Sequence, residues 1–190
     1  MSIGNIIFLA IILLAAFYAV ALYNGLVALK HNVSRNLANI GVLLKQRHDE
    51  LPKLVETCKQ YMQYEQDTLE KVIQARSQVF TANQQHNMHD LGQAENKLRS
   101  SLGQLFALAE NYPELKANET FNNLQTRISA LENSIADRRE VYNESVNNNN
   151  VRIEQFPDVI IARIFNFKAF DLLEFAADEK TDVDVKKLFS

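Results

Sequence analysis

The chain has 190 residues, of which 47% are hydrophobic, and it carries 20 basic and 23 acidic side chains for a net charge of −3. Charges this evenly balanced argue against a nucleic-acid-binding protein, which needs a strongly basic face. The single cysteine, Cys58, excludes an intramolecular disulfide and a cysteine-based zinc cluster. Because Cys58 falls on the apolar stripe of a predicted helix, we expect a buried, unreactive thiol.

The N-terminal segment is the most distinctive part of the sequence. Residues 3–22 are almost wholly apolar, and the first acidic residue is Asp49. Twenty residues rising 1.5 Å each span about 30 Å, the thickness of the hydrocarbon core of a bilayer. We therefore expect residues 1–22 to form an uncleaved transmembrane anchor. A cleaved signal peptide is the alternative, since residues 19–21 read Ala-Val-Ala, but no basic residue precedes the run and the run exceeds the usual length.

The charges that follow the anchor predict its orientation. Positive charge collects on the cytoplasmic side of membrane proteins, so the basic residues place the bundle in the cytoplasm and the N-terminus outside. Only Lys30 and Arg35 lie close enough to the span to count fully. The basic residues before the first acid are Lys30, Arg35, Lys45 and Arg47.

Beyond the anchor, apolar residues recur at spacings of three and four, which is typical of helices packed on other helices. Prolines tend to stand at helix boundaries, and they divide this region into segments. We expect an all-α fold in which the transmembrane helix is followed by an antiparallel four-helix bundle. In this reading Asp49 is the N-cap of the second helix, Pro52 lies in its first turn, and residues 81–90 form a polar loop.

Two features disturb the helical pattern. Four consecutive asparagines, Asn147–Asn150, predict a frayed or bent helix, because asparagine is a poor helix former. Residues 157–190 are too apolar for a disordered linker, so we expect this tail to dock on the bundle, on another copy or on a partner. The predicted division is thus an anchor at 1–22, a bundle at 23–156 and a tail at 157–190. The candidate docking residues are Phe165, Phe167, Phe170 and Phe175.

Residues 21–61, ALYNGLVALKHNVSRNLANIGVLLKQRHDELPKLVETCKQY, resemble the signature region of the LemA family of bacterial membrane proteins. YPELKAN at 112–118 and the paired arginines at 138–139 continue the likeness. The resemblance implies a membrane-attached helical bundle, here in the inner (cytoplasmic) membrane, and it implies no reaction. Asn166 replaces a glycine that is usual in the family's tail, one of several departures that put shared partners in doubt more than shared fold.

No catalytic or cofactor motif stands out, so we expect a protein that is not an enzyme and has no cofactor or metal. A di-metal site in a helical bundle needs Glu-x-x-His, and none of the four histidines has an acid three residues before it. A polar cluster between the first two segments has two readings, a solvated helix end or a surface for a partner or for self-association. The cluster comprises Lys45, Arg47, His48, Asp49 and Glu50.

Two functions fit this sequence. We favour a structural protein that assembles with itself as a homo-oligomer, or scaffolds other proteins, at the lipid bilayer. The alternative is a sensory or regulatory adaptor that acts on a membrane protease or kinase. Under either hypothesis a membrane protein is a candidate partner and nucleic acid is not.

Overall fold

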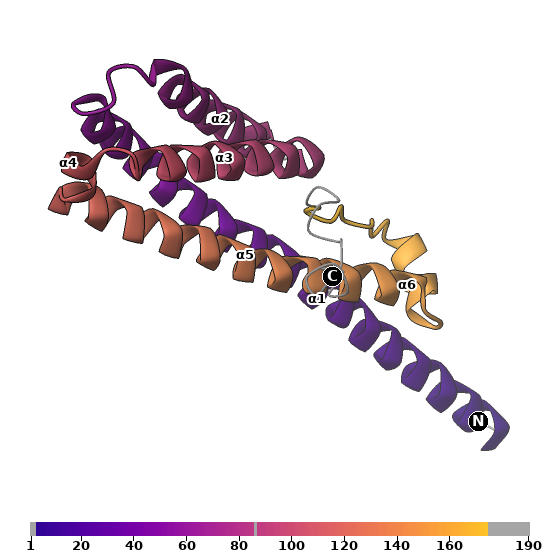
Figure 1. The fold of residues 1–190 in the computed structure, drawn as a ribbon. Coiled ribbons are helices and arrows are strands. Elements are labelled where there is room, and N and C mark those ends of the chain that lie inside the picture. Colours follow the sequence, from indigo (N-terminus) through magenta and orange to yellow (C-terminus); the bar gives the residue numbers. More distant parts are fainter. Residues whose placement is uncertain (1–2, 86, 175–190) are drawn as a thin grey trace, which may run out of the picture. The chain divides into compact units, whose positions relative to one another are not determined.

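A computed structural model describes residues 3–85 and 87–174, and within them every regular element is a helix. The predicted all-α class is therefore confirmed. The helices in chain order are α1 (Ile3–Lys59), α2 (Gln66–Gln85), α3 (Met88–Ala109), α4 (Pro113–Lys116), α5 (Glu119–Glu154) and α6 (Asp158–Ile164) (Figure 1).

Helix α1 runs unbroken through Pro52, so the predicted boundary there, with Asp49 as its cap, is wrong. Proline has no amide hydrogen to donate to the carbonyl four residues earlier, here that of His48. Arg76 supplies the missing donor, with its Nε 2.9 Å from the His48 carbonyl oxygen, and the helix continues. Helix α1 ends instead after Lys59, where the Cys58 carbonyl accepts from the two backbone amides of residues 61 and 62.

The chain divides into two compact units, which we describe separately. Unit 1 contains the described residues up to 39 together with 138–172, and unit 2 contains 40–137 with 173–174. Helices α1 and α5 each contribute to both units. The division predicted from sequence, with boundaries after residues 22 and 156, stays a prediction. Its first boundary is defined by where the chain would leave a membrane, whereas the two units are defined by contacts within the protein.

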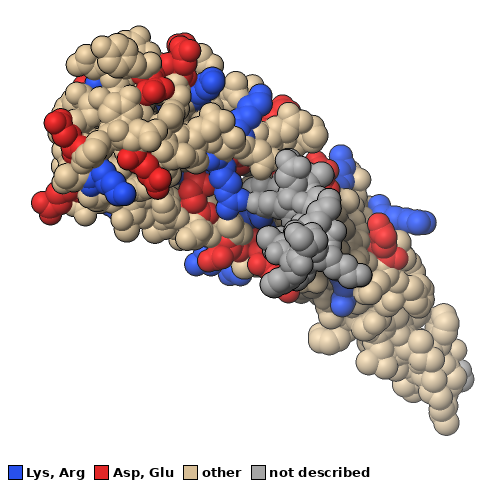
Figure 2. Space-filling model, viewed as in Figure 1, with Lys and Arg blue, Asp and Glu red and all other residues tan. Residues whose placement is uncertain are grey.

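In unit 1 the N-terminal part of α1 exposes its apolar side chains, and this helix is long and apolar enough to cross a membrane. The described N-terminal end of the chain shows no charged side chain in Figure 2. Further along the same helix, Leu26 and Val33 are buried, as are Tyr142 and Val146 of α5. Burial thus begins where the predicted membrane span ends.

Unit 2 is a helical bundle whose core is supplied by α1 from residue 40, α2, α3 and the first half of α5. Helices α2 and α3 lie side by side as a hairpin (Figure 1). The predicted loop at 81–90 is wrong, since α2 continues to Gln85 and α3 begins at Met88, with the Asn87 side chain accepting from the Asp90 amide at 3.1 Å. Buried core residues include Ile40, Leu44, Leu54, Val72, Leu91, Leu98, Leu105 and Ile128.

The asparagine run does not fray α5, which continues to Glu154, so the predicted fraying is wrong, whereas the alternative of a bent helix stays a prediction. Asn149 is buried, and its amide lies 3.4 Å from the Lys168 carbonyl oxygen. The Asn150 side chain donates to the Phe170 carbonyl at 2.9 Å and accepts from the Phe170 amide at 3.0 Å. The asparagines therefore bind the backbone of the tail, within unit 1.

Candidate interaction site

The predicted polar cluster lies on α1 in unit 2, and the structure splits it between the interior and the surface. Arg47 is 1% exposed and Glu50 is 7% exposed, whereas Lys45 and Asp49 are exposed and His48 is half-buried. The prediction of one surface made by all five is therefore wrong for Arg47, whereas Glu50 lines a surface groove. An interaction surface at the remaining residues stays a prediction. The helical period explains the split, since residues three apart lie on one face.

Arg47 is the centre of a buried ion-pair network. Its guanidinium donates hydrogen bonds to Glu95 of α3 and to Glu132 of α5, and Glu95 is itself buried. Burial raises the pKa of the Glu95 carboxyl, and the positive charge of Arg47 opposes that rise. An interior cation between two carboxylates specifies how three helices pair, because removing one partner leaves an uncompensated buried charge.

Glu95 was not singled out by the sequence analysis, although a signal for it exists. It lies between Leu91 and Leu98 at helical spacing, so an acid occupies the apolar stripe of α3. Such an acid needs a buried cation as its partner. The matching cation is Arg47, which comes three residues after buried Leu44 on α1.

His48 connects α1 to α2 through Arg76, which is half-buried. Its Nε2 lies 2.7 Å from the Arg76 Nη2, and its ring stacks on Phe80 with centroids 4.7 Å apart. Arginine only donates, so this histidine nitrogen accepts and the ring is neutral. Burial and the charge of Arg76 lower the pKa of His48, while Asp49 opposes the shift.

Glu50 borders a groove between α1 and α5 of unit 2. One of its carboxylate oxygens lies 2.7 Å from Nη2 of Arg127 and 3.4 Å from Nζ of Lys53. The groove combines apolar side chains with charges of both signs. Its lining residues are Leu43, Gln46, Asp49, Glu50, Arg127, Ala130, Leu131 and Ser134.

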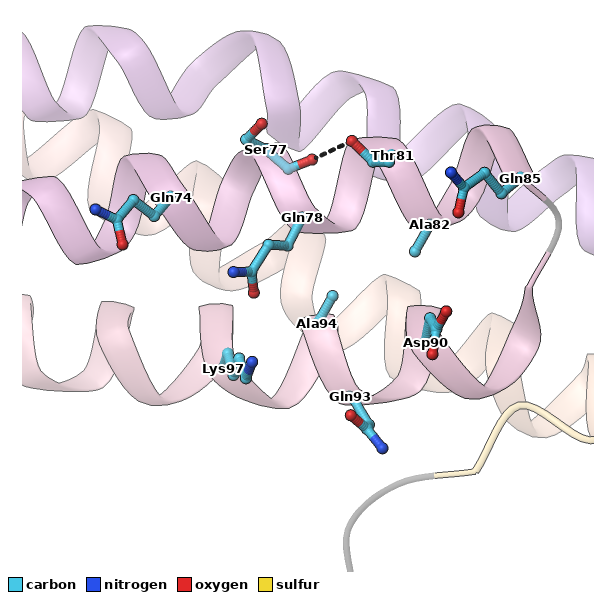
Figure 3. Close-up of a pocket in the computed structure, with 10 residues that line it drawn as sticks. All are labelled: Gln74, Ser77, Gln78, Thr81, Ala82, Gln85, Asp90, Gln93, Ala94 and Lys97. Atoms are coloured by element: carbon cyan, nitrogen blue, oxygen red, sulfur yellow. Dashed lines mark hydrogen bonds between the residues drawn. The ribbon is translucent and has the colours of Figure 1, made fainter.

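A second, open pocket of about 540 Å³ lies between α2 and α3 (Figure 3). Most of its lining is exposed amide and hydroxyl side chains, among them Gln74, Gln78 and Gln85. The Thr81 hydroxyl donates to the Ser77 carbonyl at 3.0 Å, which is the dashed line in Figure 3. This pocket is a solvated polar surface without a buried charged group.

The candidate docking residues of the tail lie in unit 1. The rings of Phe165 and Phe167 stand 4.7 and 5.8 Å from the ring of Tyr23, measured between centroids. Phe170 is held through its backbone by Asn150. Phe175 falls outside the described residues.

Cys58 is fully buried, as predicted, and burial raises the pKa of its thiol to about 12. The thiol is thus protonated at neutral pH and unsuited to nucleophilic chemistry. Within residues 3–85 and 87–174, no group of three or more histidine, cysteine or acidic side chains is placed to hold a metal ion.

Comparison with known proteins adds a family assignment to this geometry. A sequence model described as the LemA family matches residues 36–186. Magnetosome proteins MamQ 1 and MamQ 2 of Paramagnetospirillum magneticum are 29% identical over 96 residues, which is 50% of this chain and 35% of theirs. Protein LemA of Metamycoplasma hominis is 26% identical over 144 residues, 76% of this chain and 65% of its own length. The chain thus spans about a third of the length of the MamQ relatives.

Proposed function

Because this chain belongs to the LemA family, we propose that it is a non-enzymatic scaffold, anchored in a membrane, that assembles with further copies of itself. The main support for this proposal is that α1 is one continuous helix from Ile3 to Lys59. Its apolar first part is exposed and long enough to cross a bilayer, and its later part supplies Leu51 and Arg47 to the core of unit 2. The helix that enters the membrane is therefore the same helix on which the bundle is built.

A structural role is supported by how unit 2 uses its buried charges. Arg47 is engaged by Glu95 and Glu132 from two other helices. Catalytic groups must instead face a substrate, within hydrogen-bond reach of a reacting atom. The Arg47 network instead points at neighbouring helices and fixes how they pair. Fixed helix pairing gives the bundle a defined surface, which a scaffold needs.

The membrane we propose is the bacterial inner membrane, with the bundle on the cytoplasmic side. Lys30 and Arg35 follow the apolar run closely, and no acidic residue precedes Asp49. An excess of basic residues beside a span marks its cytoplasmic end. Labelling an introduced, exposed cysteine from one side of the membrane, in a chain carrying Cys58→Ala, tests this orientation.

For the self-assembly surface we propose the α1–α5 groove of unit 2, with a second copy of the chain as its occupant. A two-fold interface must be complementary to itself. This groove carries exposed charges of opposite sign, Asp49 and Arg127, beside the apolar side chains of Leu43 and Leu131. Each copy can therefore offer the acid that the other copy's arginine binds.

The native mass of the full chain, extracted gently in detergent, tests this proposal. We expect a clean multiple of 21.7 kDa for the wild type. Ala130→Arg places a long charged side chain in the groove with only a small helix penalty, and it should reduce the mass to one protomer. The matched control is Ser129→Arg, which makes the same charge change on the next, exposed position and should leave the assembly intact.

Three results would contradict the proposal. A wild-type monomer would remove self-assembly. An assembly that survives Ala130→Arg would remove the groove as its contact surface. A mass that requires a second polypeptide would favour the regulatory adaptor, and identifying that polypeptide would name the membrane protein it serves.

A further inference from the structure

The C-terminal part of unit 1 exposes a set of large apolar side chains. Phe156 is 81% exposed, Ile160 50%, Ile164 68% and Phe165 57%. Ile160 and Ile164 are four residues apart on α6, so they share one face of that helix. A contiguous apolar patch on a soluble surface usually marks a binding site for another protein or a membrane.

The position of this patch along α1 points to lipid as its occupant. The Phe165 ring lies 4.7 Å from Tyr23, and Tyr23 follows directly on the apolar run that ends at Leu22. Aromatic residues gather at this level of membrane proteins, where an apolar body meets a wet headgroup region. The Phe167 ring also contacts Tyr23, with centroids 5.8 Å apart. The Phe165 end of the patch therefore contacts α1 directly beyond its apolar run.

The charges around the patch favour an anionic lipid surface. A pocket beside Tyr23 and Phe165 is also lined by Lys30, His31 and Lys168. Lys30 and Lys168 are exposed, and seven residues of helix place Lys30 about 10 Å beyond Tyr23 along α1. Basic side chains at that depth reach lipid phosphates while their stems cover apolar surface.

We infer that α6 with its flanking aromatic residues forms a second membrane contact, lying in the interface of the bilayer that α1 crosses. Phe156, Ile160, Ile164 and Phe165 enter the headgroup–acyl boundary, and Lys30 and Lys168 bind phosphates of anionic lipids. This arrangement holds the tail against the bilayer as well as against α5. The inference rests on the membrane anchor of the proposed function and is independent of self-assembly.

The chain contains no tryptophan, so a single introduced tryptophan reports its own environment. We would reconstitute full-length Phe165→Trp in vesicles that contain phosphatidylglycerol and lipids brominated on the acyl chain. The expected result is blue-shifted emission that the brominated lipids quench. Tyr64→Trp, at a position 94% exposed in unit 2, is the matched control and should emit as in water without quenching.

A third variant separates this inference from the anchor. Phe8→Trp lies in the apolar part of α1 and must be quenched strongly if α1 crosses the bilayer. Without that quenching, the proposal that α1 anchors the chain in the membrane is wrong. Quenching of Phe8→Trp but not of Phe165→Trp overturns the second contact. The emission of Phe165→Trp could instead be blue-shifted, unquenched by lipids and lost on dilution into more lipid. That result assigns the patch to a second copy of the chain and also overturns the second membrane contact.

The lipid charge is tested on the same reporter. Adding Lys168→Glu to Phe165→Trp should weaken quenching in phosphatidylglycerol vesicles and leave it nearly unchanged in phosphatidylcholine vesicles. Lys71→Glu, which changes an exposed charge on α2, is the control and should have no effect. Equal quenching in both lipids, insensitive to Lys168→Glu, would overturn the assignment of Lys168 to anionic headgroups.

Discussion

The Nε of Arg76 donates a hydrogen bond to the His48 carbonyl at 2.9 Å, and that carbonyl is the one Pro52 leaves without a helical donor. A defect in α1 is thus repaired by a side chain from α2. The same guanidinium reaches the His48 ring through Nη2. One arginine therefore ties α2 to the proline turn of α1 by both the backbone and the side chain of His48.

Arg76→Ala should destabilise unit 2 by about 1–3 kcal/mol, because it leaves a half-buried carbonyl without a donor. Thermal unfolding of the full chain in detergent, followed by circular dichroism, measures this. The control is Pro52→Ala, which restores the helical donor to the His48 carbonyl. Arg76→Ala should cost clearly less in the Pro52→Ala background, and equal costs in the two backgrounds would refute the repair.

His48 should make unit 2 less stable as the pH is lowered through the ordinary histidine pKa of about 6.5. The folded state lowers the pKa of His48, through burial first and then through Arg76. Between the lowered pKa and the ordinary value the unfolded chain holds more protons, so the free energy of unfolding rises with pH. His48→Gln should flatten this part of the profile, and an unchanged profile in His48→Gln would show that His48 does not contribute.

Arg47→Met should be the most damaging single change in unit 2, with a cost of about 3–5 kcal/mol, because buried Glu95 and half-buried Glu132 both lose their ion pair with Arg47. Replacing both acids by leucine in the same chain should recover most of the loss. Unfolding temperatures of the single and triple variants measure the difference. If the triple variant is as unstable as the single one, the cost comes from lost packing and not from unpaired charge.

Much of this fold follows from residues that are close in sequence, and the errors come from residues that are not. The spacing of Leu91, Leu98 and Leu105 predicts a helix because each turn repeats locally. Pro52 predicts a boundary for an equally local reason. The boundary is absent because Arg76 of another helix donates to the His48 carbonyl in place of the missing proline amide. A linear pattern does not show which side chain will reach a given carbonyl.

The same reasoning applies to the polar residues. Asn149 and Asn150 were expected to weaken α5, since their intrinsic helix preference is low. Their tail partners lie about twenty residues further on and become visible only when the chain folds back. Glu95 differs, because an acid on an apolar stripe is readable from the sequence, and only the identity of its partner needed the structure.

Asn150→Ala should release the tail while leaving α5 intact. It removes two hydrogen bonds to the Phe170 backbone, each contributing about 0.5–1.5 kcal/mol. Hydrogen exchange should show faster exchange of the Phe170 amide. Exposed Asn148→Ala is the control, and because alanine is the better helix former it should preserve or slightly increase protection. Unchanged protection of Phe170 in Asn150→Ala would show that the tail is held by other contacts.

Gly92→Ala should displace the chain at Glu174, because a Cβ on Gly92 would lie 2.2 Å from the Glu174 carbonyl oxygen. Glycine here permits close approach of the backbone to α3, next to buried Leu173. Gly103→Ala on the same helix is the control, since its Cβ would meet no atom within 4 Å, and it should stabilise the helix by up to about 1 kcal/mol. Limited proteolysis should therefore cut near residue 174 faster in Gly92→Ala and at the wild-type rate in Gly103→Ala. Equal rates in all three chains would show that this contact does not hold the segment in place.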